Sequence, residues 1–201
     1  MRKALRFGGG FTLVEILVVV SIIGLLAGLS IPAVGGALRS AKKAKVAAMA
    51  QQIRVALSQY YTEYGTFLTN GTPWDSQRGF GTLAGNTTMT LMGNTNNPVA
   101  TRDNPRSVPF LEVPMDFMMN KRTNTLSQNG MVTPSGFYRL GSLRNRQVNF
   151  YYAVDHDYNG SVWVTNTVGA TANLQEIPGT TAVWFIDPDD TQGRKTIGTW
   201  K

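Results

Sequence analysis

The stretch GGGFTLVEILVVVSIIGLLAGLSIPAVGGAL, residues 8–38, decides the fold of this chain. No charged residue occurs between Glu15 and Arg39, so residues 16–38 form an uncharged run. As a helix with a rise of about 1.5 Å per residue, this run would extend about 34 Å, and the hydrocarbon core of a bilayer is about 30 Å thick. The sequence therefore predicts a membrane-spanning helix near the N-terminus.

Basic residues flank the uncharged run on both sides. They are Arg2, Lys3 and Arg6 before the run, and Arg39, Lys42, Lys43 and Lys45 after it. A net charge of +7 and an isoelectric point of 9.9 would suit nucleic acid, but the rest of the chain has no basic stripe interleaved with aromatics. Basic clusters in these places are typical of membrane topology signals. We expect a cytoplasmic N-terminus, a head on the other side of the membrane, and no nucleic-acid partner.

Small residues occupy an unusual place relative to the apolar run. An ordinary secretory signal has its small-residue cleavage site after the apolar stretch. Here Gly8, Gly9 and Gly10 come before it. A cut after Gly10 would remove only the basic leader and would leave the apolar helix on the mature protein.

With Gly10, Phe11, the following Thr12-Leu13-Val14-Glu15 and Pro32, the first sixty or so residues resemble the type IV prepilin family. That family includes the pseudopilins of type II secretion, and the major pseudopilins are the most similar. In the family, a membrane-embedded prepilin peptidase cuts after the glycine and methylates the new terminal amine. The resemblance implies a cytoplasmic leader over residues 1–10, cleavage between Gly10 and Phe11, and N-methylation of Phe11.

Glu15 is the acidic residue at the start of the apolar helix. A carboxylate in a membrane is costly unless it is paired, so such residues usually mark function. The next basic residue, Arg39, is 24 positions away, about 36 Å along a helix. The resemblance implies that Glu15 pairs with the terminal amine of a neighbouring subunit and sets the register of a polymer. The alternative is a glutamate that only favours the helix dipole from its N-terminal position.

Pro32 falls inside the uncharged run, at the position where the family commonly has proline. Proline removes a backbone hydrogen bond, so we expect a local break near residues 30–36 in an assembled filament. An ordinary kink that lipid tolerates is the alternative. Gly24 and Gly28 form a G-x-x-x-G pair, which permits close approach of helices.

The helical pattern continues through residues 39–64 with an amphipathic stripe. Its apolar positions recur at spacings of three and four: Val46, Met49, Ile53, Leu57, Tyr60 and Tyr64. Gly65 is a natural stop for this helix. Residues 66–135 are rich in glycine, asparagine, threonine and proline, and they predict long loops, with a short strand over residues 107–113.

From Gln147 onward the pattern is that of β-structure. Residues 148–154 and 161–164 predict a hairpin joined across Asn159-Gly160, followed by a third strand over residues 181–186. The sequence as a whole predicts an α+β fold, in which a long N-terminal helix packs on a C-terminal antiparallel sheet. The predicted parts are a leader (1–10), a transmembrane and polymerisation helix (11–38), an amphipathic helix (39–64) and a periplasmic head (65–201).

Two acidic clusters in the head are candidate Ca²⁺ sites. Asp155, Asp157 and Asn159, followed by Gly160, match the first half of a Ca²⁺ loop, but Asn166 occupies the place of the bidentate glutamate. The resemblance points instead to a C-terminal acidic loop, which here contains Asp187, Asp189 and Asp190. The alternative is that both clusters are solvated turns closed by their own side chains.

No catalytic set is recognisable in the sequence. The chain has no cysteine and a single histidine, His156, with no nucleophile–base pattern around it. We therefore expect a structural subunit and not an enzyme. The first hypothesis is a pseudopilin of type II secretion, which would drive export of proteins by polymerising. Its expected partners are further copies, the prepilin peptidase, the inner-membrane assembly platform and the minor pseudopilins.

Two alternatives stay open. One is a type IV pilin of a surface fibre for adhesion, motility or DNA uptake, although such pilins often close a C-terminal loop with a disulfide. The other is a membrane-tethered binding module that carries a prepilin-type leader.

Overall fold

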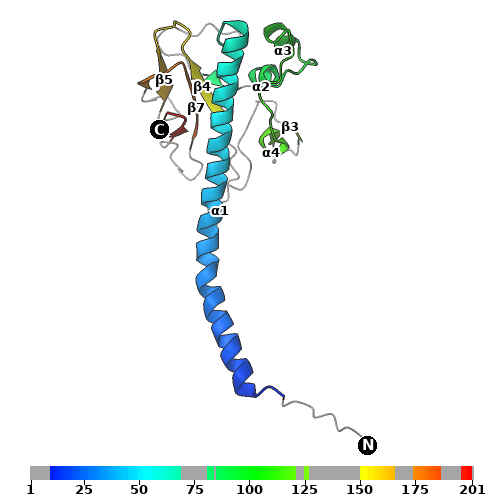
Figure 1. The fold of residues 1–201 in the computed structure, drawn as a ribbon, viewed down its shortest axis with the longest axis vertical. Coiled ribbons are helices and arrows are strands. Elements are labelled where there is room, and N and C mark those ends of the chain that lie inside the picture. The colour runs from blue at the N-terminus through cyan, green and yellow to red at the C-terminus, as the bar shows by residue number, and fades with distance from the viewer. Residues whose placement is uncertain are drawn as a thin grey trace, which may run out of the picture. The chain divides into compact units, whose positions relative to one another are not determined.

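A computed structural model describes residues 10–68, 81–83, 85–120, 125–126, 150–165, 174–186 and 196–200 (Figure 1). The chain divides into two compact units, residues 1–41 and residues 42–201, which are described separately. The helix α1 (Leu13–Tyr64) contributes to both units.

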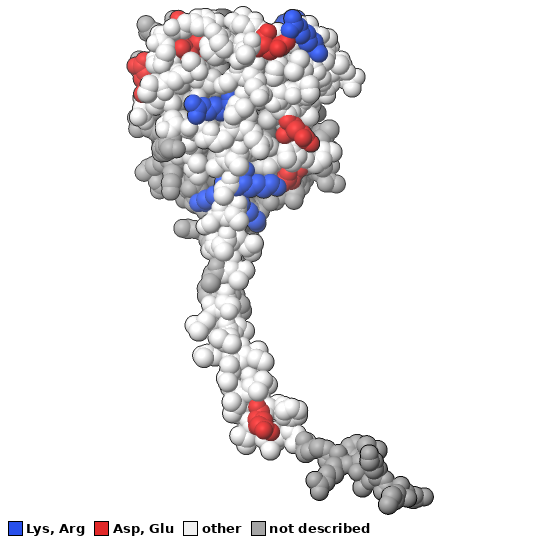
Figure 2. All heavy atoms as spheres, in the orientation of Figure 1, with Lys and Arg blue, Asp and Glu red and all other residues white. Residues whose placement is uncertain are grey.

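In the first unit, α1 exposes its apolar side chains along the described length. Leu17, Leu25 and Leu29, for example, are each 60–68% exposed. On the visible face in Figure 2, the described side chains of this unit are almost all uncharged. By length and composition, α1 is able to cross a membrane.

In the second unit, α1 buries one stripe of side chains. Val46, Met49, Ile53, Leu57 and Tyr60 are all buried in the core of the head, as the spacing predicted. The helix ends at Tyr64, and Gly65 follows with φ of +69° while its N–H donates to the Tyr61 carbonyl (2.8 Å). Glycine adopts this left-handed conformation without steric cost, which confirms Gly65 as the stop.

The main sheet of the head has four antiparallel strands in the order β1-β4-β7-β8. They are β1 (Gly81–Thr82), β4 (Phe150–Val154), β7 (Thr181–Ile186) and β8 (Thr196–Gly198). Side chains alternate between the two faces, as the pleat requires. Tyr152 and Val183 join the core that contains α1, whereas Ala153, Ala182 and Trp184 belong to a second core on the opposite face.

The second core lies beneath a small sheet of β5 (Ser161–Thr165) and β6 (Leu174–Pro178). The β4 strand pairs with β7 and not with β5, so the predicted hairpin across Asn159-Gly160 is wrong. Asp155 N–H donates to the Thr180 carbonyl and Gly179 N–H to the Gly160 carbonyl, each at 2.9 Å. One long ribbon therefore runs through β4–β7 and β5–β6, and residues 156–159 are an insertion that bends it (Figure 1).

Short helices occupy part of the region predicted as loops. They are α2 (Gly85–Leu91), α3 (Pro98–Asp103) and α4 (Met115–Met118), and a two-strand pair of β2 (Met119–Asn120) and β3 (Thr125–Leu126) follows. Residues 107–113 form no strand, because the N–H groups of Phe110 and Leu111 both donate to the Leu91 carbonyl and not to a sheet. Figure 1 shows α2 and α3 beside the head portion of α1.

The architecture is α+β, with a long N-terminal helix and a C-terminal antiparallel sheet, as predicted.

Gly93 and Gly65 offer a matched test of packing in the head. Both have φ near +68°, but a Cβ on Gly65 would meet nothing, whereas a Cβ on Gly93 would lie 2.6 Å from the Ser107 carbonyl oxygen. The left-handed conformation alone costs a non-glycine residue about 1–2 kcal/mol. We expect Gly93→Ala to destabilise the head by about 1–3 kcal/mol more than Gly65→Ala, because the Ser107 backbone must also move.

Chemical denaturation of the two variants and the parent measures this difference. Equal losses for the two alanine variants would contradict the predicted clash at Gly93.

Candidate functional site

The start of α1 is the first candidate site, and it is organised by Thr12 and Glu15. Thr12 N–H donates to Glu15 Oε2 at 2.7 Å, and the Thr12 hydroxyl donates to the same oxygen at 2.8 Å. In return, Thr12 Oγ1 accepts a hydrogen bond from the Glu15 backbone N–H at 3.3 Å. This reciprocal pairing is a capping box, which satisfies N–H groups that a helix leaves free at its first turn.

The capping box gives the carboxylate a partner within its own chain. Glu15 is exposed, and the bonds it makes in the described residues come from Thr12, three positions away. The carboxylate is therefore oriented toward the N-terminal end of α1. Its partner Thr12 directly follows Phe11 in the sequence. A group that arrives at this end with a positive charge would meet an oriented carboxylate and the dipole of the helix.

The predicted cleavage point lies directly before this box. Gly10 and Phe11 are both exposed, and Phe11 is 84% exposed. Neither residue belongs to α1, which begins at Leu13. A peptide bond in exposed backbone outside a helix is available to a peptidase without unfolding of regular structure.

The backbone of α1 continues as helix through Pro32. The local break near residues 30–36 was predicted for an assembled filament, so it stays a prediction. Two hydroxyls on the apolar surface are satisfied within the helix: Ser21 donates to the Leu17 carbonyl and Ser30 to the Leu26 carbonyl, each at 2.7 Å. These bonds lower the cost of placing a hydroxyl in lipid.

Thr12 is the residue whose role the sequence reasoning missed. The signal was present, since threonine followed three residues later by glutamate, directly before an apolar run, is the capping-box pattern. The structure therefore adds Thr12, as the hydrogen-bond partner of Glu15, to the residues predicted for the N-terminal site.

The second candidate site is the turn that contains Asp155, Asp157 and Asn159. Asp155 is buried, and its two oxygens accept hydrogen bonds from the N–H groups of Asn159 and Gly160, each at 2.9 Å. The Asn159 amide donates to Asp157 (2.9 Å), and its oxygen accepts from the Ser161 N–H (2.8 Å). The structure brings the three predicted ligands together, but their bonds close the insertion that bends the ribbon.

A cation in this turn would have to compete with those bonds. Among the described residues there is no group of three or more His, Cys, Asp or Glu side chains placed to hold a metal ion. Asp187, Asp189 and Asp190, the other predicted Ca²⁺ ligands, lie outside the described residues. His156 is exposed and lies in the same turn, between Asp155 and Asp157.

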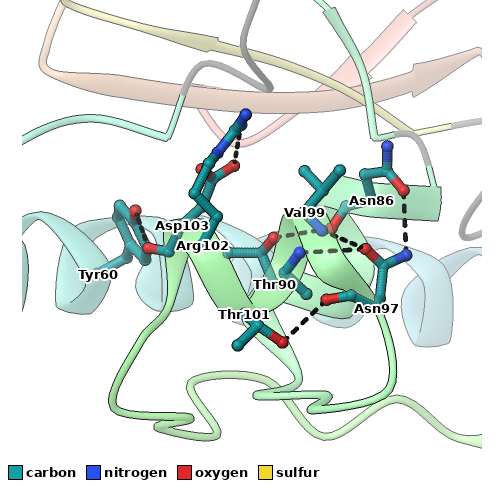
Figure 3. Close-up of polar contacts among 9 residues, drawn as sticks. Tyr60, Asn86, Thr90, Asn97, Val99, Thr101, Arg102 and Asp103 are labelled. Atoms are coloured by element: carbon teal, nitrogen blue, oxygen red, sulfur yellow. Dashed lines mark hydrogen bonds and ion pairs between the residues drawn. The ribbon is translucent and has the colours of Figure 1, made fainter.

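A third polar cluster joins α1, α2 and α3 (Figure 3). Asn97 caps α3 by accepting from the N–H groups of Val99 (2.9 Å) and Ala100 (3.1 Å), and its amide donates to the Asn86 side chain (3.1 Å). Pro98 follows at the first helical position, where its missing N–H costs nothing. Figure 3 shows Asn97 and Asn86 pointing toward one another.

Asn104 ends α3 and is the buried centre of this cluster. Its amide donates to the carbonyls of Thr90 and Val108, both at 2.8 Å. Its oxygen accepts from the Val108 N–H (3.0 Å) and the Tyr64 hydroxyl (2.6 Å). Asn104 thus uses its full hydrogen-bonding capacity to join α1, α2 and the segment that follows α3.

Tyr60 adds a second link between α1 and α3. Its hydroxyl donates to the Asp103 carbonyl at 2.7 Å (Figure 3). Burial, with smaller contributions from the charge of Asp103 and from Tyr64, raises the pKa of Tyr60 to about 12. This phenol is therefore neutral at physiological pH and is a structural donor, not a proton-transfer group.

Comparisons with protein-family models, with curated proteins and with solved structures found no match to this chain.

Proposed function

We propose that the chain is a prepilin-class subunit: a protein anchored in the inner membrane by α1, cut after Gly10, and polymerised through α1 into a pseudopilus of type II secretion. The observation that carries the proposal is the arrangement at the start of α1. Exposed backbone at Gly10-Phe11 is followed at once by the Thr12–Glu15 capping box and then by an uncharged helix with exposed apolar side chains.

Each part of this arrangement has a use in such a subunit. The glycine and phenylalanine give the peptidase its site, and Phe11 becomes the methylated terminus. The carboxylate of Glu15 receives the terminal amine of a neighbour. The uncharged helix is soluble in lipid before assembly and packs against other copies afterward, since neither state requires burial of an unpaired charge.

The bonding of buried polar groups in the described part of the head supports a structural role. Its buried polar groups, such as Asp155 and Asn104, are bonded to backbone groups of turns and caps. The chain has no cysteine, which favours a pseudopilin over a surface pilin whose C-terminal loop is closed by a disulfide.

Processing provides the direct test. When the chain is expressed in a bacterium with a prepilin peptidase, we expect mass spectrometry to find a mature protein that begins at Phe11 and carries one added methyl group. In the control, Gly10→Leu places a bulky side chain at the cut, and we expect the full leader to be retained. An intact leader on the parent chain, in cells where a known prepilin is cut, would refute the proposal.

A further inference from the structure

We propose that a groove in the head, between α1 and β8, receives the uncharged part of α1 from a second copy of this chain. This inference rests on the proposed function, because it names the surface against which the polymerising helix packs. The groove has a volume of about 440 Å³, with Ala47, Ala48 and Gln51 on one wall and Ile197 and Gly198 on the other.

Small side chains keep the groove open. The two alanines extend only a methyl group from α1, and Ala48 is exposed. On the opposite wall Gly198 contributes backbone only, because it pairs with Trp184 of the second core and a Cβ there would face that core, 2.2 Å from the Trp200 ring. The α1 wall is thus short of side-chain volume, Ile197 is half-buried on the β8 wall, and Phe185 at the buried side is already fully packed.

The groove is also neutral. None of its lining residues carries a charge, whereas Figure 2 shows lysine and arginine side chains elsewhere on the visible face of the head. A charged occupant would lose its hydration without gaining a partner, which is unfavourable. The chemistry of the groove therefore selects an uncharged apolar segment.

The chain carries such a segment and leaves it uncovered. Residues 16–38 contain no charge, and large side chains such as Ile22, Leu26 and Val34 are 51–58% exposed. The segment belongs to the first unit and the groove to the second, and the uncovered segment is available to another copy. The occupant is therefore a second copy, and small residues on the groove wall permit the close approach that helix packing in membranes uses.

Cysteine cross-linking tests this contact without background, because the chain has no native cysteine. Ala48→Cys in one copy is combined with a single cysteine at successive positions from Ile22 to Leu38 in another. The two chains are expressed together with a prepilin peptidase and an assembly platform, and the filaments are oxidised. We expect disulfide-linked dimers that recur every three to four positions, because one face of a helix lies in the groove.

The matched control is Ser58→Cys, which is exposed on the same helix but outside the groove. We expect it to form at least about fivefold fewer dimers with the same partners. Equal yields from the two positions, dimers between two Ala48→Cys copies, or no dimers in well-formed filaments would each overturn the groove assignment. The last result would leave lipid or another protein as the occupant.

A second variant separates this inference from the proposed function. Ala48→Trp would fill the groove from an exposed position, so we expect the melting temperature of the chain to be unchanged and filament yield to fall at least about tenfold. Ala48→Trp with normal filaments would overturn the groove alone. A parent chain that is not processed and forms no filament would instead refute the proposed function.

Discussion

Replacement of Asn104 by alanine is expected to destabilise the head by about 3–5 kcal/mol. The side chain is 1% exposed and makes four hydrogen bonds, to the Thr90 carbonyl, to both backbone groups of Val108 and to the Tyr64 hydroxyl. A buried group that loses its only partner costs about 1–3 kcal/mol. Alanine leaves both groups of Val108 without this partner and opens a cavity, so the loss exceeds that of a single bond.

The control for this substitution is Asn96→Ala. Asn96 is exposed in the same region, so the same chemical change should alter stability by less than about 0.5 kcal/mol. Tyr64→Phe removes one of the four bonds and should cost about 1 kcal/mol. The double variant Asn104→Ala/Tyr64→Phe should cost less than the sum of the two single losses, because both remove the same bond. Urea denaturation of the parent and the four variants measures these losses, and a loss below about 1 kcal/mol for Asn104→Ala would contradict the assigned role.

Local patterns in the sequence predicted the positions of helices and strands better than they predicted which strands pair with one another. The buried stripe from Val46 to Tyr60 and the strand over residues 181–186 were predicted correctly, because helix period and β-propensity are properties of neighbouring residues. The pairing of β4 was predicted wrongly. The carboxylate of Asp155 closes residues 156–159 into a turn, on either side of which β4 pairs with β7 and β5 pairs with β6.

In the candidate sites too, local patterns were predictable from the sequence and long-range contacts were not. The capping box at Thr12 and Glu15 spans only three residues, so its pattern could have been recognised from the sequence. Asn104 could not, since its partners Tyr64, Thr90 and Val108 are brought together only by the folded head. The asparagine and proline content of residues 66–135 predicted loops, although Asn97 and Pro98 begin the helix α3.

Loss of the negative charge at Glu15 is expected to reduce filament yield at least about tenfold, whether the replacement is glutamine or alanine. Two roles of this residue have to be separated: closing the capping box with Thr12, and pairing with the terminal amine of a neighbour. Glutamine retains the capping geometry, because it can accept from the Thr12 N–H, but it cannot form an ion pair. Alanine loses both roles. If assembly depends on the charge, the two variants should be equally deficient.

Thr12→Ala is the complementary variant, because it weakens the cap and keeps the carboxylate. We expect it to reduce filament yield less than Glu15→Gln does, since the charge is still available to the neighbour. Filaments sheared from cells are quantified by immunoblot and electron microscopy, and mass spectrometry confirms that each variant is cut before Phe11. Normal filaments from Glu15→Gln would show that the cap alone suffices and would exclude charge pairing. A deficiency of Thr12→Ala equal to that of Glu15→Gln would place the function of Glu15 in the start of the helix and not in its contact with a neighbour.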